Sequence, residues 1–216
     1  MNTKRIAFWS AFVVVLALIF WGLVVALNKP AASITSGISS PAPVTSADHI
    51  LGTSTAPVTL IEYGDFQCPA CAAYSSMIEK LASDEGNSLR VVFRHFPLSQ
   101  HQNALITAQA AEAASAQGKF WDMYKLIYDN QTSWENQSDQ DIRKTLAGYA
   151  SSLKLDMTTF ASDLDSAATK KVIQDELAEG QSIGIDYTPS LFINGKIITN
   201  PSSYAAFKAL IDAAAR

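Results

Sequence analysis

Residues 62–71 read EYGDFQCPAC and contain both cysteines of the 216-residue chain, Cys68 and Cys71. A run rich in β-branched and aromatic residues, 57–63, precedes the pair, and a run with apolar residues at helical spacing, 69–83, follows it. These patterns predict a strand and then a helix that begins next to Cys68. Because the free N–H groups and the dipole at a helix N-terminus stabilise an anion, Cys68 is predicted to be the attacking thiolate and Cys71 its partner.

Two other kinds of site use paired cysteines. A tetrahedral zinc site needs two more ligands, but His49, His95 and His101 are scattered without a paired spacing, so no metal site is predicted. A static disulfide across so short a loop would remove little entropy from the unfolded chain. The pair is therefore interpreted as redox-active, and it needs no cofactor.

The residues after the pair indicate a parallel sheet. Gly86 and Asn87 are expected to end the helix, and 89–96 has the composition of a second strand. A strand, a helix and a strand joined in this way form a βαβ unit, in which the strands pair in parallel.

Glu62 is an unusual residue inside the first predicted strand, because its neighbours are apolar. A carboxyl group buried there would have a raised pKa and could pass protons to and from Cys71 through water. The alternative places Glu62 at a sheet edge with its side chain in solvent.

A long helical region separates these strands from the last ones. Ser138 followed by Asp141 has the spacing of a helix N-terminus within it. The predicted helical segments are 103–117, 120–128, 141–153, 158–166 and 170–183. Strand patterns return at 190–193 and 196–198 around an Asn-Gly turn, and a last amphipathic helix begins near Pro201.

Three features in this order resemble the DsbA-type branch of the thioredoxin-fold oxidoreductases, and membrane-tethered bacterial members most closely. They are FQCPAC at 66–71, the helical insertion at about 100–183, and TPSLFING at 188–195. The resemblance covers 48–216. It implies an α/β thioredoxin fold with an inserted helical domain, and an exported enzyme that exchanges thiols and disulfides with proteins.

The resemblance also assigns roles to residues outside the cysteine pair. It implies that the Thr188–Pro189 peptide bond is cis and faces the pair, so that the Thr188 backbone can bind an extended substrate segment. A trans bond is the ordinary alternative for a residue before proline. The family has an acidic residue at the position of Glu62.

Other residues are predicted at the substrate-binding surface. Phe66 and Tyr187 are expected to offer apolar contacts to unfolded clients, although either one could belong to the core. Pro69 and Ala70 lie between the cysteines, where residues contact substrate and tune the redox potential. Strongly oxidising relatives place a histidine before the second cysteine, and this chain has Ala70 there, so extreme oxidising strength is not expected.

The N-terminal residues indicate a membrane anchor. Residues 1–5 include Lys4 and Arg5, and 6–27 carry no charge over about 33 Å of helix, which is enough to cross a bilayer. The basic residues are expected to keep 1–5 in the cytoplasm, with the rest of the chain outside. A cleaved signal peptide is the alternative. Residues 28–47, rich in Ser, Thr and Pro, are predicted to be a flexible linker.

Composition and location together favour one function. The formal net charge is −4, without basic clusters, so a nucleic-acid partner is not expected. The chain is predicted to be a single-pass membrane protein that forms disulfides in reduced exported proteins. A quinone-linked membrane protein of the DsbB or vitamin K epoxide reductase type would reoxidise it. A disulfide reductase or isomerase, and a chaperone-like client-binding module, are the alternatives.

Overall fold

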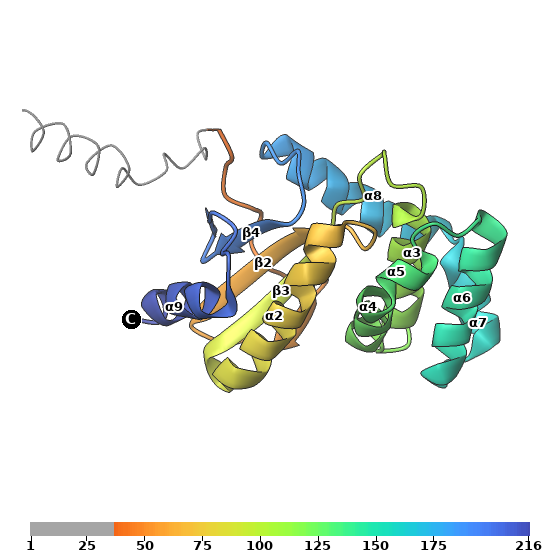
Figure 1. Ribbon diagram of the computed structural model, residues 1–216, viewed down its shortest axis with the longest axis horizontal. Coiled ribbons are helices and arrows are strands. Elements are labelled where there is room, and N and C mark those ends of the chain that lie inside the picture. The colour runs from red at the N-terminus through yellow and green to blue at the C-terminus, as the bar shows by residue number, and fades with distance from the viewer. Residues whose placement is uncertain (1–36) are drawn as a thin grey trace, which may run out of the picture. The chain divides into compact units, whose positions relative to one another are not determined.

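The computed structural model describes residues 37–216 (Figure 1). The cytoplasmic segment and the anchor predicted at 1–5 and 6–27 lie outside the described residues, as do residues 28–36 of the predicted linker. Within 37–216, no helix is both long enough and apolar enough to span a bilayer.

Five strands form one mixed sheet in the order β1-β3-β2-β4-β5. Strands β2 and β3 pair in parallel through α2, which confirms the predicted βαβ unit, and the other neighbouring pairs are antiparallel. Strand β1 was not predicted; it adds to β3 at the edge of the sheet. The strands are β1 His49–Gly52, β2 Val58–Gly64, β3 Leu89–His95, β4 Ser190–Ile193 and β5 Lys196–Ile197.

The turn between β4 and β5 has the predicted conformation. Asn194 and Gly195 both have positive φ angles, 48° and 77°, as a type I′ turn requires. The turn is also tied to β2, because the Asn194 side-chain oxygen accepts the Thr59 N–H at 2.8 Å.

Helices cover both faces of the sheet (Figure 1). One face packs against α2, Pro69–Glu85, and α9, Tyr204–Ala214, and a short 3-10 turn, η1 Gly86–Ser88, leads from α2 into β3. Side chains from alternate strand positions meet those helices: Val58, Leu60, Val91, Leu191 and Ile193 pack with Ile78, Leu81, Phe207 and Ile211. The alternation follows from the two-residue period of a strand.

The helical insertion lies between β3 and β4 in the chain, as predicted. Its helices are α3 Ala104–Ser115, α4 Phe120–Asp129, α5 Gln131–Trp134, α6 Asp139–Ser152, α7 Met157–Leu164 and α8 Ala167–Ser182. Helix α6 begins where the sequence predicts, because the Ser138 hydroxyl accepts the Asp141 N–H at 3.3 Å. The single turn of α5 was not predicted.

Helix α8 leaves the insertion to cover the second face of the sheet. Leu177 of α8 packs against a cluster that contains Ile61, Tyr63, Val92 and Phe192. Helix α8 therefore joins the insertion to the five-stranded sheet.

Residues 37–47, the second half of the predicted flexible linker, lie against the folded domain. Ile38 and Val44 are partly buried against the face of the sheet that α8 covers. The Ser39 N–H donates to the Ile183 carbonyl at 2.9 Å. The packed region of the chain thus begins before the predicted boundary, because this segment has two apolar side chains to bury.

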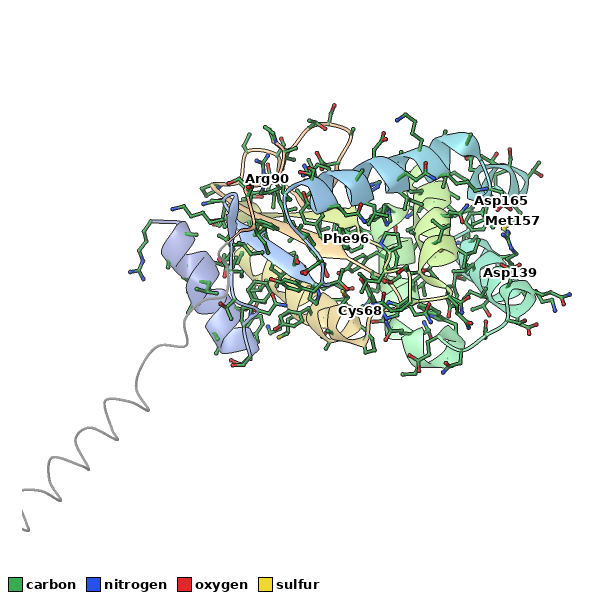
Figure 2. The ribbon with its side chains drawn as sticks, turned by 90° about the horizontal axis from the view of Figure 1, so that it is seen from above. Cys68, Arg90, Phe96, Asp139, Met157 and Asp165 are labelled. Atoms are coloured by element: carbon green, nitrogen blue, oxygen red, sulfur yellow. The ribbon has the colours of Figure 1, made fainter. Side chains whose placement is uncertain are left out.

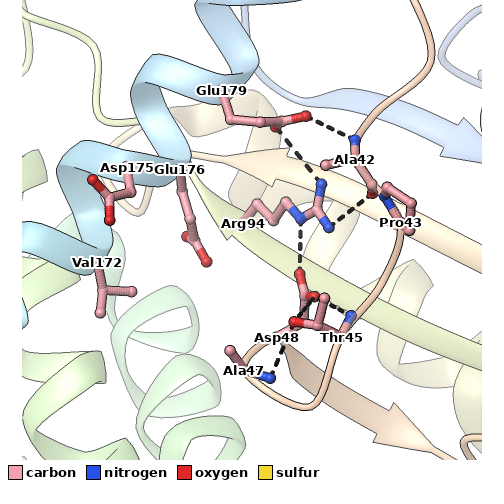
Figure 3. Close-up of a pocket in the computed structure, with 10 residues that line it drawn as sticks. All are labelled: Ala42, Pro43, Thr45, Ala47, Asp48, Arg94, Val172, Asp175, Glu176 and Glu179. Carbon is pink, nitrogen blue, oxygen red and sulfur yellow. Dashed lines mark hydrogen bonds and ion pairs between the residues drawn. The ribbon is translucent and has the colours of Figure 1, made fainter.

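Arg94 fixes this segment to the sheet (Figure 3). Its guanidinium donates to Asp48 Oδ1 at 2.8 Å, to the Ala42 carbonyl at 3.1 Å and to the Tyr63 hydroxyl at 2.9 Å, and lies 3.6 Å from Glu179. Of these residues, all but Tyr63 border a cavity between the segment and α8. Because Arg94 is only 5% exposed, the network is shielded from water and can hold the segment in place.

Candidate functional site

Cys68 caps the N-terminus of α2, with Pro69 in the first turn of the helix. Its φ and ψ angles, −72° and 120°, are extended, and its carbonyl accepts the Ala72 N–H at 3.1 Å. Figure 2 shows Cys68 beside the helical insertion. The helix therefore begins where the sequence predicts, and its free N–H groups lie at the Cys68 side chain.

The two thiols are free and differ in their electrostatic surroundings. The Cys71 thiol donates to Cys68, and the N–H groups of Cys71 and Ala70 also stabilise the anion. Although partial burial opposes them, these bonds lower the pKa of Cys68 to about 5. Burial, then the bond to Cys68 and the nearby Glu62, raise the pKa of Cys71, which is 0% exposed. At neutral pH the pair is a thiolate beside a protonated thiol.

Glu62 lies in the central strand β2 and is 0% exposed, so the solvent-facing alternative does not hold. Burial raises the pKa of Glu62 to about 8, against a weak opposing bond from the Tyr124 hydroxyl at 3.3 Å. Its Oε1 atom is buried without a hydrogen-bond partner among the described residues. The side chain is thus a neutral acid at pH 7, close enough to the pair to feel its charge.

The loop before β4 faces the cysteine pair. The Thr188–Pro189 peptide bond is cis, and the Thr188 carbonyl oxygen lies 3.5 Å from Cys68 Sγ. Asn200 holds the loop from the other side by donating to the Pro189 carbonyl at 2.8 Å. The fold therefore brings together β2, the start of α2 and the loop that contains Pro189.

Comparison with known proteins identifies this arrangement. A family model described as Thioredoxin matches residues 44–213. The chain belongs to the thioredoxin family. Oxidised BdbD from Bacillus subtilis is 25% identical, with a TM-score of 0.70 over 82% of this chain and 98% of BdbD. Wolbachia pipientis α-DsbA1 is 22% identical, with a TM-score of 0.69 over 80% of this chain and 92% of that structure. The resemblance to DsbA-type enzymes is confirmed by these structural matches.

Some proteins with similar sequences are much longer than this chain. The Na⁺/H⁺ antiporter NhaA 1 of Mycolicibacterium gilvum (strain PYR-GCK) is 32% identical over 203 residues, which cover 88% of this chain and 32% of the antiporter. The NhaA of Herminiimonas arsenicoxydans is 35% identical over 169 residues, which cover 78% of this chain and 26% of the antiporter. The chain spans at most about a third of these relatives, so their named activity is not carried over to it.

The residues predicted at the substrate-binding surface of this thioredoxin site differ in exposure. Pro69 and Ala70 are exposed beside Cys68, and Tyr187 is 40% exposed. Phe66 is only 1% exposed, with its ring centroid 5.2 Å from that of Phe93. The expectation that Phe66 contacts clients is therefore corrected, because the aromatic cluster between sheet and insertion holds its ring in the core.

Asp65, which was not predicted as a site residue, supports the loop between β2 and α2. One oxygen of its buried carboxylate accepts the Gln67 N–H at 2.7 Å. The other accepts the Leu98 N–H at 2.9 Å and lies 2.7 Å from His101 Nδ1. The available signal was its position, because an Asp directly after a strand commonly accepts N–H groups of the next loop.

A second group of polar side chains joins the insertion to the sheet. The Oε1 atom of Glu112, on α3, lies 2.5 Å from His49 Nε2 and 2.8 Å from His95 Nε2. Burial opposes ionisation, but the two imidazoles lower the pKa of Glu112 to about 2. Their ligand atoms lie within 4.8 Å of one another, so these residues could hold a metal ion. The present spacings are hydrogen-bond distances, shorter than the roughly 3.3 Å between two ligands of one zinc ion, so the carboxylate would have to move.

Proposed function

We propose that this chain is an exported oxidase that transfers a disulfide between Cys68 and Cys71 to reduced, folding proteins. The observation that carries the proposal is the lowered pKa of Cys68, at the N-terminus of α2. A stabilised thiolate favours the reduced form of the pair, so the oxidised form becomes the better oxidant.

The reaction consists of two thiol–disulfide exchanges. A client thiolate attacks Cys68 Sγ of the disulfide, the bond to Cys71 breaks, and the Cys71 sulfur leaves with the electron pair and takes up a proton. A second client thiolate then attacks the client sulfur of the mixed disulfide, and Cys68 leaves as a stable thiolate. The client loses two electrons and gains a disulfide, while the cysteine pair is reduced.

Glu62 is proposed to supply and remove the proton on Cys71. It is buried and neutral at pH 7, and its charge is coupled to that of Cys71. A carboxyl group with a pKa near the working pH can give a proton in its acid form and take one back as the carboxylate. Transfer through water would let Glu62 act without direct contact with the sulfur.

The client is proposed to bind as an extended segment across the loop that contains Pro189. The backbone of Thr188 would hydrogen-bond to the segment, with Pro69 and Ala70 on the opposite side of the cysteine pair. Tyr187 supports this surface, because it is an exposed aromatic residue next to Thr188. Phe66 is excluded from it by its burial.

An extracytoplasmic location accompanies this function. The charge-free run at 6–27 supports a membrane anchor, and an exported location is one in which disulfides persist. The reduced pair would then be reoxidised by a quinone-linked membrane protein of the DsbB or vitamin K epoxide reductase type. The similar α-DsbA2 of Wolbachia pipientis is described as a thiol-disulfide exchange protein.

Complementation tests this function in cells. In a bacterium that lacks its own disulfide-forming oxidase, the full chain should restore disulfides in an exported reporter enzyme. A double variant, Cys68→Ser with Cys71→Ser, should fail while accumulating to the same level. Equal activity of both proteins would instead support the chaperone-like alternative.

A further inference from the structure

Gln131 links the helical insertion to the backbone of residues 65–68, the loop between β2 and α2 that ends at Cys68 and is named the redox loop. Its side-chain nitrogen donates to the Phe66 carbonyl at 2.7 Å and to the Cys68 carbonyl at 3.0 Å. A primary amide has two N–H groups, so one side chain can serve both carbonyls. Gln131 is 5% exposed, which shields both bonds from water.

The two carbonyls belong to two peptide groups that set the position of Cys68. One joins Phe66 to Gln67 and the other joins Cys68 to Pro69. The Cys68 carbonyl also accepts the Ala72 N–H and so begins α2. The Phe66 carbonyl belongs to a residue that is 1% exposed, where water is a poor substitute for a lost donor. Removing the amide of Gln131 would therefore allow both peptide groups to rotate away from their present orientation.

We propose that Gln131 is a positioning residue for the redox reaction, which holds Cys68 at the helix N-terminus and opposite the Thr188 carbonyl. This inference rests on the proposed exchange at Cys68. The hydrogen bonds of Gln131 go to the backbone, so it acts through the loop. Its place on the single turn of α5 gives that short element of the insertion a function.

Loss of the Gln131 amide should change the pKa of Cys68 as well as the stability of the fold. The N–H groups of Ala70 and Cys71 stabilise the Cys68 anion only while the sulfur stays over the first turn of α2. If the loop relaxes, these bonds lengthen and the pKa of Cys68 rises. A purely structural bond would lower the stability of the fold and leave this pKa unchanged.

Gln109 provides a matched control elsewhere in the insertion. It is 3% exposed, and its side-chain nitrogen donates to the Leu164 carbonyl at 2.9 Å. It therefore makes the same type of buried bond from a glutamine side chain to a backbone carbonyl. Its acceptor belongs to α7 and not to the redox loop.

The test measures the pKa of Cys68 in the reduced full chain from thiolate absorbance at 240 nm as a function of pH. Gln131→Met keeps the length of the side chain and removes both donors, and Gln131→Glu keeps its shape. Both variants should raise this pKa by about half a unit to one unit. The oxidised pair should then be a weaker oxidant, with an equilibrium constant against glutathione lowered roughly 3- to 10-fold. Gln109→Met should lower the melting temperature and leave the pKa at the wild-type value.

The inference is overturned if the Gln131 variants fold and titrate as the wild type does. If neither variant folds, the wild-type protein still tests it by nuclear magnetic resonance. The side-chain amide signal of Gln131 should then shift with the Cys68 titration while that of Gln109 stays constant, and no shift at Gln131 would reject the role. A wild-type pair that does not exchange with glutathione would reject the proposed function itself, which is a separate result.

Discussion

The sulfur of Cys68 lies 3.5 Å from the backbone carbonyl oxygen of Thr188, although 120 positions separate the two residues in the chain. This contact brings the start of α2 to the loop before β4, and it forms because β2 pairs with β4 in the centre of the sheet. A substrate segment bound along Thr188 would therefore pass the attacking sulfur. The reaction surface depends on the sheet, whereas the insertion supports it from the side.

The two cysteines should behave differently when replaced. Cys68→Ser should lower the rate of disulfide transfer to a reduced test protein by at least about 1000-fold, because it removes the sulfur that exchanges with the client. Cys71→Ser should also stop turnover but should accumulate a mixed disulfide at Cys68. Non-reducing electrophoresis and mass spectrometry distinguish the two, and a stable adduct in the Cys68→Ser variant would contradict the assignment.

Stability should depend on pH in the reduced protein more than in the oxidised one. The pKa of Cys68 in the folded protein is lowered to about 5 from an ordinary value of 9.0. The thiolate's contribution to the free energy of unfolding is therefore present above the unfolded pKa and is lost as pH falls through about 5. Between pH 5 and pH 8, the free energy of unfolding of the reduced form should rise by about 3–4 kcal/mol relative to the oxidised form. Urea unfolding of both forms measures this difference, and a constant difference would contradict the thiolate assignment.

Glu62→Gln should stabilise the fold at pH 7 by about 1–3 kcal/mol. The pKa of Glu62 in the folded protein is raised to about 8 from 4.5. The contribution of Glu62 to the free energy of unfolding is therefore present below the unfolded pKa and is lost as pH rises through about 8. Glutamine does not ionise and should remove this loss. The matched control is Glu79→Gln on α2, where the side chain pairs with exposed Lys125.

The same Glu62→Gln variant tests the proton-transfer role. Its rate of thiol–disulfide exchange should lose the part of the pH dependence centred near pH 8. An unchanged pH profile, measured with the Glu79→Gln control alongside, would leave Glu62 as a buried polar residue without a role in the reaction.

Two glycines in the insertion should respond in opposite ways to alanine. A Cβ atom at Gly180 of α8 would lie 2.8 Å from the Phe96 ring and 3.1 Å from Tyr63, so Gly180→Ala should destabilise the fold by about 1–3 kcal/mol. A Cβ atom at Gly148 of α6 would meet nothing within 4 Å, so Gly148→Ala should stabilise it by about 0.5–1 kcal/mol. Thermal unfolding measures both, and a neutral Gly180→Ala would show that α8 can move off the sheet.

The parts of the structure that could be predicted depend on local patterns. The cysteine pair, the strand before it and the helix after it are adjacent in the sequence, and their residue types are specific. The turn at Asn194 and Gly195 could be predicted from these two residue types, because both adopt the positive φ angles that the turn requires. The positions of Thr188 and Pro189 opposite the pair came from the family resemblance, since no local pattern connects residues so far apart.

The parts that could not be predicted depend on distant partners. Residues 37–47 have the composition of a free linker, but Ala42 bonds to Glu179, which is 137 positions away. Phe66 is apolar, and composition alone does not distinguish a core ring from a client-binding one. Gln131 lies in a polar stretch, and its two acceptors are visible only once the insertion is folded onto the redox loop.

The equilibrium of the full chain with glutathione tests the central claim most directly. Quantifying the oxidised and reduced forms of the Cys68–Cys71 pair at defined ratios of glutathione to its disulfide gives the reduction potential. If the chain is the proposed oxidase, the stabilised Cys68 thiolate should give the pair a reduction potential above about −200 mV. A potential near that of thioredoxin, about −270 mV, together with a reduced pair in growing cells, would contradict the assignment.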